Sequence, residues 1–121
     1  VLNFENNRIL ESHLRDKIKI ISYFDVQAGY DIVSFESDSS THFDRFIEVK
    51  SYKGKPHFYW SKNESEIAKI KGDNYYLYIV DIVKINDSEY EPIIIQNPAS
   101  KLYNDSSWLI ETQSMLITKL T

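Results

Sequence analysis

The chain of 121 residues contains no cysteine. This absence excludes a disulfide scaffold, a zinc site built on thiolates and a cysteine nucleophile, and it fits a reducing compartment. The sequence also lacks any apolar run near the roughly 18 residues that a membrane span requires. No secretory signal peptide is visible. We therefore expect a cytoplasmic protein without a membrane partner.

Several familiar catalytic motifs are missing as well. There is no Walker-type phosphate loop and no dinucleotide-binding fingerprint. The histidines, His13, His42 and His57, have no metal-ligand spacing and no sequence context for Ser-His-Asp chemistry. The sequence therefore gives no support to a histidine-based nucleophilic hydrolase.

What is present is typical of a globular protein. The hydrophobic fraction is 42%, with 9 Tyr, 6 Phe and 2 Trp, and the length suffices for one domain with its own core. The chain begins with Val1 and not with Met, so we expect residues 1–121 to be a single domain excised from a larger protein.

The net charge of −4 is unusual for a domain that binds nucleic acid alone, because such domains generally carry a basic face. Lysines nevertheless gather between Lys50 and Lys71. Such local basicity is compatible with a nuclease whose neighbouring domains supply most of the affinity, and equally with a solvated surface.

Hydrophobic periodicity predicts a mixed sheet with helices beside it. Helices are predicted over residues 5–16 and from about 62 to Gly72, and strands over 31–36, 44–52, 57–60, 74–84 and 92–96. Residues 17–24 are predicted as a strand or as a passage from helix to strand. The run at 74–84 is nearly continuous in apolar residues, so we expect a strand buried on both faces, and another buried strand at 92–96. The tail at 106–121 is compatible with a helix or with a two-strand hairpin. The order indicates an α/β or α+β fold, with a mixed central β-sheet flanked by helices.

Two details of this prediction concern helix ends and aromatic residues. Asn3 or Asn6 is expected to cap the first helix, and Ser61 with Glu64 has the spacing of a capping box at the second. The aromatic residues of the central segment could stack on bases, but core packing is the preferred interpretation; they are Phe58, Tyr59, Trp60, Tyr75, Tyr76 and Tyr78.

Two of the expected strands bring two acids and a lysine together. If residues 31–36 and 44–52 pair as a hairpin around the polar turn at 37–42, Asp31 lies opposite or nearly opposite Glu48 and Lys50. Glu48 and Lys50 share a face because side chains alternate along a strand. Two carboxylates and an ammonium in one patch can hold a divalent cation and a water molecule for metal-assisted hydrolysis. The plain alternative is a solvated strand face.

The pattern of Asp31, 16 intervening residues and Glu48-x-Lys50 resembles the core of the restriction-endonuclease-like nucleases. The chain resembles one branch more closely, the DUF3883 domain, also called the protein NO VEIN C-terminal domain. The matching segments follow the expected order: Gly-Tyr-Asp-Ile at 29–32, Phe-Ile-Glu-Val-Lys at 46–50, Ser-Lys-Asn-Glu at 61–64, Gly-Asp-Asn-Tyr-Tyr-Leu-Tyr at 72–78 and Asn-Pro-Ala at 97–99. Gly-Tyr stands where the nuclease motif has proline before Asp31, so the assignment of this acid rests on order and spacing.

The resemblance implies a restriction-endonuclease-like fold and a metal site. Asp31 and Glu48 would bind Mg²⁺, or Mn²⁺ in its place, with the carbonyl of Val49 as a backbone ligand. Mg²⁺ suits such a set because it is hard and keeps part of its water shell. Lys50 would orient the attacking water. Glu11 corresponds to the acidic residue that many members of the superfamily carry on the first helix, where it supports the metal or a second ion.

At the start of the second helix, Lys62 is a candidate for contact with the DNA backbone, since helix N-termini attract phosphate. The resemblance thus implies a Mg²⁺-dependent endonuclease module that hydrolyses DNA phosphodiester bonds, in a restriction or DNA-defence protein. Its expected partners are DNA, other domains of the parent protein and a second copy of the chain in a homodimer.

The alternative is a catalytically inactive module with the same fold that serves DNA binding or protein contact. The net acidity favours this alternative. The retained Asp31, Glu48 and Lys50 favour the enzyme, because two adjacent carboxylates carry an electrostatic cost that a module without catalysis has no reason to keep.

Overall fold

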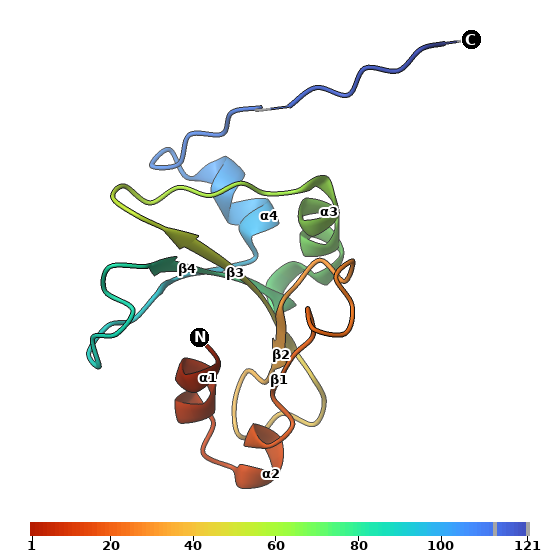
Figure 1. Cartoon of the computed structure of the whole chain (residues 1–121). Coiled ribbons are helices and arrows are strands. Elements are labelled where there is room, and N and C mark those ends of the chain that lie inside the picture. The colour runs from red at the N-terminus through yellow and green to blue at the C-terminus, as the bar shows by residue number, and fades with distance from the viewer. Residues whose placement is uncertain (113, 121) are drawn as a thin grey trace.

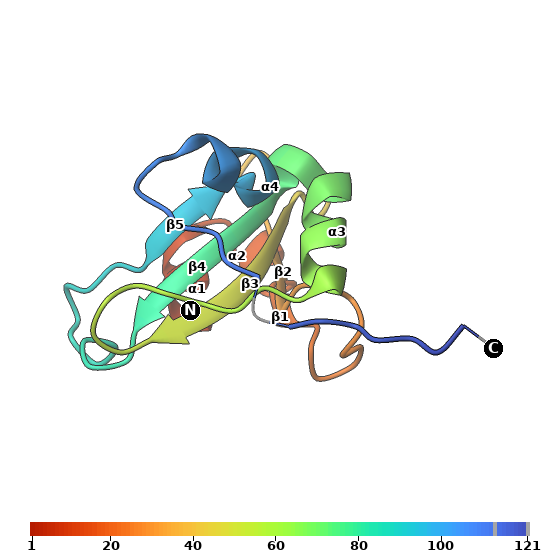
Figure 2. The same ribbon diagram turned by 90° about the horizontal axis from the view of Figure 1, so that it is seen from above.

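A five-stranded mixed sheet forms the centre of the computed structural model, which describes residues 1–112 and 114–120 (Figures 1 and 2). In spatial order its strands are β1 (Lys19–Ile20), β2 (Ile32–Ser34), β3 (Arg45–Tyr52), β4 (Tyr75–Asp81) and β5 (Ile93–Gln96). β3 and β4 run parallel, and the other neighbouring pairs are antiparallel. The predicted α+β class with a mixed central sheet is confirmed.

Helices lie on both faces of the sheet, with α1 (Leu2–Arg8) and α2 (Ser12–Arg15) on one face and α3 (Lys62–Lys71) and α4 (Pro98–Lys101) on the other (Figure 1). Short 3₁₀ turns follow α3 at Gly72–Asn74 and α4 at Leu102–Asn104. None of the helices in the described part of the chain is long and apolar enough to cross a membrane.

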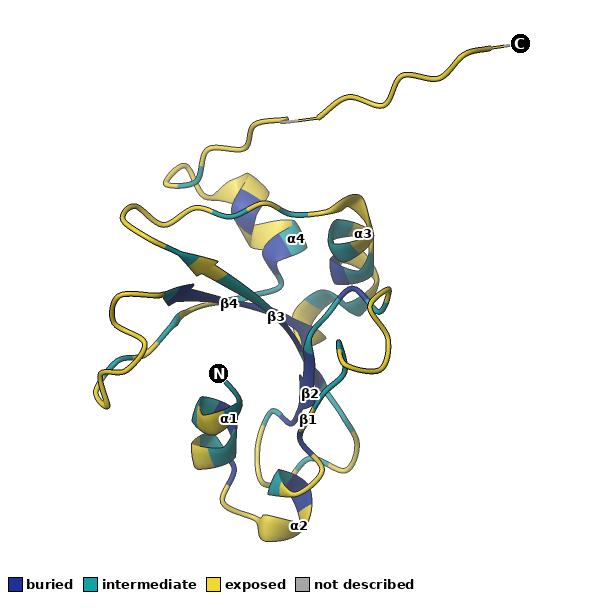
Figure 3. Ribbon diagram, viewed as in Figure 1, coloured by how far each residue is buried: buried dark blue, intermediate teal, exposed yellow. Residues whose placement is uncertain are grey.

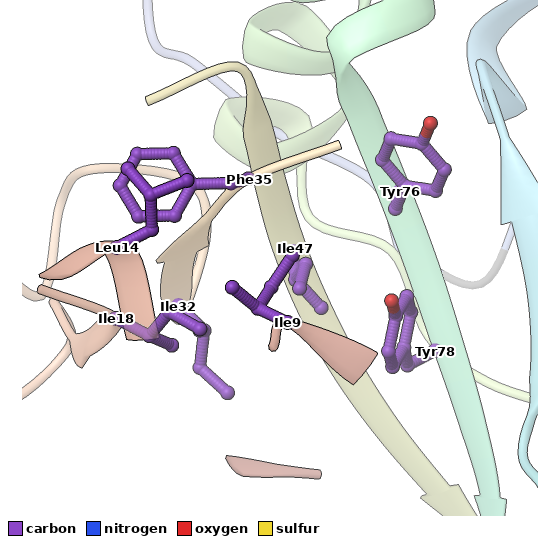
Figure 4. Packing of buried hydrophobic residues seen from close by; sticks show 8 residues of the cluster. All are labelled: Ile9, Leu14, Ile18, Ile32, Phe35, Ile47, Tyr76 and Tyr78. Carbon is purple, nitrogen blue, oxygen red and sulfur yellow. The ribbon is translucent and has the colours of Figure 1, made fainter. Parts of the chain in front are cut away.

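Strand β4 contributes side chains to two hydrophobic clusters, because successive side chains of a strand point to opposite faces of the sheet. Tyr76 and Tyr78 join the cluster under α1 and α2, whose buried members are drawn in Figure 4. Tyr75, Leu77 and Ile79 join the cluster under α3 and α4. The strand is buried on both faces, as its continuous apolar sequence predicts (Figure 3).

The prediction for β5 is correct in place and wrong in burial. Ile93 and Ile94 are 36% and 39% exposed, because β5 is the edge of the sheet and pairs with β4 alone. Among the central aromatic residues the three tyrosines of β4 are buried, and Phe58 and Trp60 pack against the second cluster. Core packing is therefore confirmed for this group, except for Tyr59, which is 72% exposed.

The single helix predicted over residues 5–16 is wrong, because the chain forms two helices with a break between them. The carboxylate of Asp38 accepts hydrogen bonds from the amides of Leu10 and Glu11, at 2.7 and 2.8 Å, and so satisfies donors at the start of α2. Neither Asn3 nor Asn6 caps the first helix, since α1 begins at Leu2 and both lie inside it.

Residues 17–24 form a passage from helix to strand, one of the two predicted forms, with a strand only at Lys19–Ile20 because the chain turns directly afterwards. Two other segments differ from their predictions. Residues 57–60 form no strand; the rings of Phe58 and Trp60 pack against the second cluster in place of pairing with the sheet. The tail is neither helix nor hairpin over 106–112 and 114–120, while Gln113 and Thr121 lie outside the described residues.

Helix α3 follows its sequence signals closely. The hydroxyl of Ser61 accepts from the amide of Glu64 at 3.1 Å, and the Glu64 carboxylate accepts from the amide of Ser61 at 3.0 Å, which completes the predicted capping box. The helix ends at Gly72, whose φ of 56° lies in the left-handed region. α3 connects the parallel strands β3 and β4, so its N-terminus lies near the carboxyl end of β3.

Candidate active site

A cavity of about 440 Å³ opens where the loop before β2, strand β3 and the start of α3 meet. The loop contributes Ser22, Val26, Gln27, Gly29, Tyr30 and Asp31; β3 contributes Glu48; and the start of α3 contributes Ser61, Asn63 and Glu64. Both predicted metal-binding carboxylates therefore face one space, which has the size of a small-ligand site.

Asp31 is fixed by its backbone and its side chain together. β2 and β3 pair with Ile32 opposite Ile47, so the next position of this antiparallel register places Asp31 opposite Glu48. The Asp31 amide donates to the Ile47 carbonyl at 2.7 Å, and the Asp31 carboxylate accepts from the Val49 amide at 2.8 Å. The predicted hairpin is confirmed, and it brings the two acids side by side.

Glu48 is the buried member of the pair, with only 6% of the residue exposed. Burial, hydrogen bonding to the Asp31 carboxylate and the charge of that carboxylate raise the pKa of Glu48 to about 9. The charge of Glu64 acts in the same direction, and Lys50 opposes it. Without a cation, the site therefore holds a proton on Glu48, shared with a neighbouring carboxylate.

Lys50 lies on the same face of β3 as Glu48, two residues further on, as predicted. Its ammonium donates to the Glu64 carboxylate at 2.8 Å, and the two side chains are 17% and 20% exposed. Glu64 therefore caps α3 and also binds Lys50. Sequence reasoning assigned Glu64 to the capping box alone; the signal for its second role is its place at the start of a helix that directly follows the lysine-bearing strand.

The donor set fits a hard divalent cation. In an extended strand the N–H and C=O of one residue point toward the same neighbouring strand, so the Val49 carbonyl points toward the side on which its amide meets Asp31. Two carboxylates and one carbonyl, completed by waters, form a ligand set that Mg²⁺ accepts. Across residues 1–112 and 114–120, no group of three or more His, Asp or Glu side chains is placed to hold a metal.

Two other residues of the predicted site lie apart from the cavity lining. Glu11 stands at the N-cap of α2, with its side chain 58% exposed and 3.7 Å from the His13 ring. Its predicted metal role finds no support in this geometry and stays a prediction. Lys62 opens α3 between two cavity residues, but its side chain is 89% exposed and lies 3.9 Å from Glu66. Its contact with DNA also stays a prediction.

The buried acid of the first helix is Glu5, which the sequence did not single out. It accepts hydrogen bonds from Ser34 at 2.7 Å and Tyr78 at 2.6 Å, and it forms ion pairs with Arg8 and Arg45. Burial alone would raise the pKa of Glu5, but these partners outweigh it and hold the pKa below its usual value. This cluster joins α1 to the sheet on the face opposite the cavity.

Gly29 shapes the loop that carries Asp31. Its φ is +83°, and its carbonyl accepts from the buried Tyr75 hydroxyl at 2.7 Å. A Cβ added here would lie 2.7 Å from Cγ1 of Ile67, on α3. The loop therefore approaches α3 too closely for any side chain at this position.

We expect Gly29→Ala to lower the free energy of unfolding by about 2 kcal/mol more than Gly54→Ala does. Gly54 is the matched control, because its φ of +82° gives the same backbone strain while nothing lies within 4 Å of its added Cβ. Urea denaturation of both variants measures the difference. Equal losses would contradict the close approach of this loop to α3.

Comparison with known proteins bears on the same residues. The sequence model of the family described as Protein NO VEIN, C-terminal, matches residues 6–95. That range contains the cavity residues Asp31, Glu48 and Glu64, and it also contains Lys50. No curated protein and no solved structure matches the chain. The match extends over most of the sequence, and the chain therefore belongs to the protein NO VEIN C-terminal family.

Proposed function

We propose that this domain is a Mg²⁺-dependent endonuclease module with a restriction-endonuclease-like fold, which hydrolyses DNA phosphodiester bonds within a larger cytoplasmic restriction or DNA-defence protein. One observation carries the proposal: the antiparallel register sets Asp31 beside Glu48 in a cavity that Glu64 also lines, and the ammonium of Lys50 donates to Glu64. The resemblance of this arrangement to nuclease cores supports it.

Asp31, Glu48 and the carbonyl of Val49 would hold the cation, and Glu48 would release its proton when the cation takes the proton's place. Bound there, Mg²⁺ would lower the pKa of its water and stabilise negative charge on the phosphate. Lys50 would place a compact positive charge beside the developing charge of the transition state.

Glu64 would hold Lys50 in position. The Lys50 ammonium lies 2.8 Å from the carboxylate of Glu64, which belongs to the capping box of α3. Because this ion pair already fixes the lysine, its side chain loses little freedom when substrate binds. In the reaction a water oxygen would bond to phosphorus and release a proton to solvent, the ester P–O bond would break, and the leaving oxygen would take up a proton from solvent.

The direct test is calorimetric titration of Mg²⁺ and Mn²⁺ into the wild-type chain and into Asp31→Asn, with plasmid cleavage measured in parallel. We expect the substitution to weaken metal binding at least about tenfold and to remove cleavage, because one of two carboxylate ligands becomes neutral. Asparagine keeps an oxygen that accepts from the Val49 amide, so the fold survives.

Glu66→Gln is the matched control, since it removes one acid, 56% exposed, outside the cavity lining. It should bind metal and cleave like the wild type, whereas Glu11→Gln tests separately whether Glu11 supports the metal. Asp31→Asn with wild-type metal affinity and cleavage would refute the proposed site.

The second candidate is the inactive module for DNA binding or protein contact, on its own or as a homodimer. The net charge of −4 favours it. It predicts no metal binding and no cleavage by the wild type, and a partner affinity that Asp31→Asn leaves unchanged.

A further inference from the structure

Two aromatic side chains stand exposed beside the acidic cavity. Tyr23 is 79% exposed and Phe24 is 80% exposed. They lie in the turn that follows β1, where the amides of Phe24 and Asp25 donate to the carbonyl of Ile21 at 2.8 and 2.9 Å. Neither aromatic residue belongs to the two hydrophobic clusters found among residues 1–112 and 114–120.

The loop that presents them closes on Asp31. The carbonyl of Asp31 accepts from the amide of Ile21 at 2.6 Å and from that of Ser22 at 3.3 Å. Ser22 and Val26 line the cavity and directly flank residues 23–25. The residue with the metal-binding carboxylate therefore also fixes the base of the aromatic turn.

The second half of the loop is held by α3 and the sheet. The side-chain amide of Asn63 donates to the carbonyl of Gln27 at 2.8 Å, and the Tyr75 hydroxyl donates to the carbonyl of Gly29. The backbone of this loop is thus anchored at both ends, although the side chains of Tyr23 and Phe24 stay largely exposed.

We propose that Tyr23 and Phe24 form a stacking site for an unpaired nucleobase, so that the substrate of the acidic cavity is single-stranded DNA. This inference rests on the proposed function and names its substrate class. Every base offers a π-face, so stacking on exposed aromatic residues binds single strands with little dependence on sequence. Bases paired inside a duplex do not present that face.

Charge leads to the same substrate. With a net charge of −4 and the carboxylates of Asp31 and Glu64 at the cavity, the domain attracts phosphates weakly. Contacts with bases supply affinity that does not depend on charge. A single strand held at Tyr23 and Phe24 runs past Ser22 and Val26, and so brings a phosphate of the adjoining nucleotide to the carboxylates.

The test is fluorescence anisotropy with a labelled single-stranded oligonucleotide and with its blunt duplex, in buffer containing Ca²⁺ and again with chelator. We expect the wild type to bind the single strand more tightly than the duplex. The double variant with Tyr23→Ala and Phe24→Ala should bind the single strand about tenfold or more weakly than the wild type does. Tyr23→Phe with Phe24→Tyr should retain it, because the aromatic faces remain. Tyr103→Ala is the control, since Tyr103 is 60% exposed and lies in the 3₁₀ turn after α4, which contributes no residue to the cavity lining.

An unchanged affinity in the double alanine variant overturns the stacking site, and so does a wild type without measurable affinity for the single strand. Failure of the proposed nuclease activity would give a different experimental result. In that case the wild type binds the single strand through Tyr23 and Phe24 but does not cleave it with Mg²⁺. If the double alanine variant cleaves duplex DNA as fast as the wild type, the nuclease activity is supported and the single-stranded substrate is refuted.

Discussion

Glu48→Gln is expected to stabilise the metal-free domain at about pH 8 and to have little effect near pH 5. The pKa of Glu48 rises from an ordinary 4.5 to about 9 on folding, because the side chain is buried beside Asp31. Glutamine has the same shape, stays neutral and can donate to Asp31 as the protonated acid does. It therefore keeps the contacts of the folded state and removes a group that ionises only on unfolding.

The sign of this effect follows from which state binds the proton. Below pH 4.5 both states are protonated and Glu48 costs nothing; between 4.5 and 9 the unfolded chain loses the proton that the folded chain keeps. Stability contributed by Glu48 thus falls as pH rises through this window and is lost above it. We expect Glu48→Gln to be more stable than the wild type by about 2–4 kcal/mol at the upper end of the window.

Urea denaturation with chelator at several pH values measures the difference between the two proteins, which cancels the titration of all other groups. Glu66→Gln is the matched control, because Glu66 lies on α3 with its side chain 56% exposed. It should show no such trend. A difference between wild type and Glu48→Gln that stays constant with pH would mean that Glu48 is ionised in the folded domain. Mg²⁺ should stabilise the wild type and leave Glu48→Gln nearly unaffected.

The parts of the site that sequence predicted are those fixed by local rules. Period-two alternation places Glu48 and Lys50 on one face, and the hairpin register then places Asp31 opposite Glu48. The capping box of α3 likewise depends on residues three apart. Each of these features needs only a few neighbouring positions to be correct.

The parts that sequence missed depend on contacts between distant segments. The predicted first helix is broken because the carboxylate of Asp38, in the β2–β3 loop, accepts hydrogen bonds from the amides of Leu10 and Glu11. Helical periodicity carries no information about such a contact. The pairing of Lys50 with Glu64 is likewise set by the crossover from β3 through α3.

The turn with Tyr23 and Phe24 shows the same limit. Alternation over residues 17–24 predicts a strand, yet β1 ends at Ile20 because the carbonyl of Asp31 takes the next two amides and the chain turns. The aromatic residues consequently leave the sheet and stand beside the cavity. A segment whose sequence predicts a strand thus belongs to the candidate substrate site, because its backbone amides bind the distant carbonyl of Asp31.

Lys50→Met is expected to reduce DNA cleavage about 10²–10³-fold, because it removes a positioned positive charge from the transition state. Methionine keeps much of the length and apolar character of the lysine side chain. Mg²⁺ affinity should not fall, since the lost charge opposed a cation at Asp31 and Glu48. The measurements are cleavage rates at saturating Mg²⁺ and calorimetric affinity, and their separation identifies a role in the reaction.

Glu64→Gln distinguishes the charge of Lys50 from the way it is held. Glutamine retains the capping box, so α3 keeps its start, but the ion pair with Lys50 is lost. The ammonium remains beside the cavity with more freedom, and we expect cleavage to fall by less than about tenfold. Stability should fall by about 1–3 kcal/mol, because an ammonium on a side chain only 17% exposed loses its charged partner. If Lys50→Met cleaves like the wild type while both variants lose similar stability, Lys50 serves only to anchor α3 through Glu64, and the reaction proceeds without it.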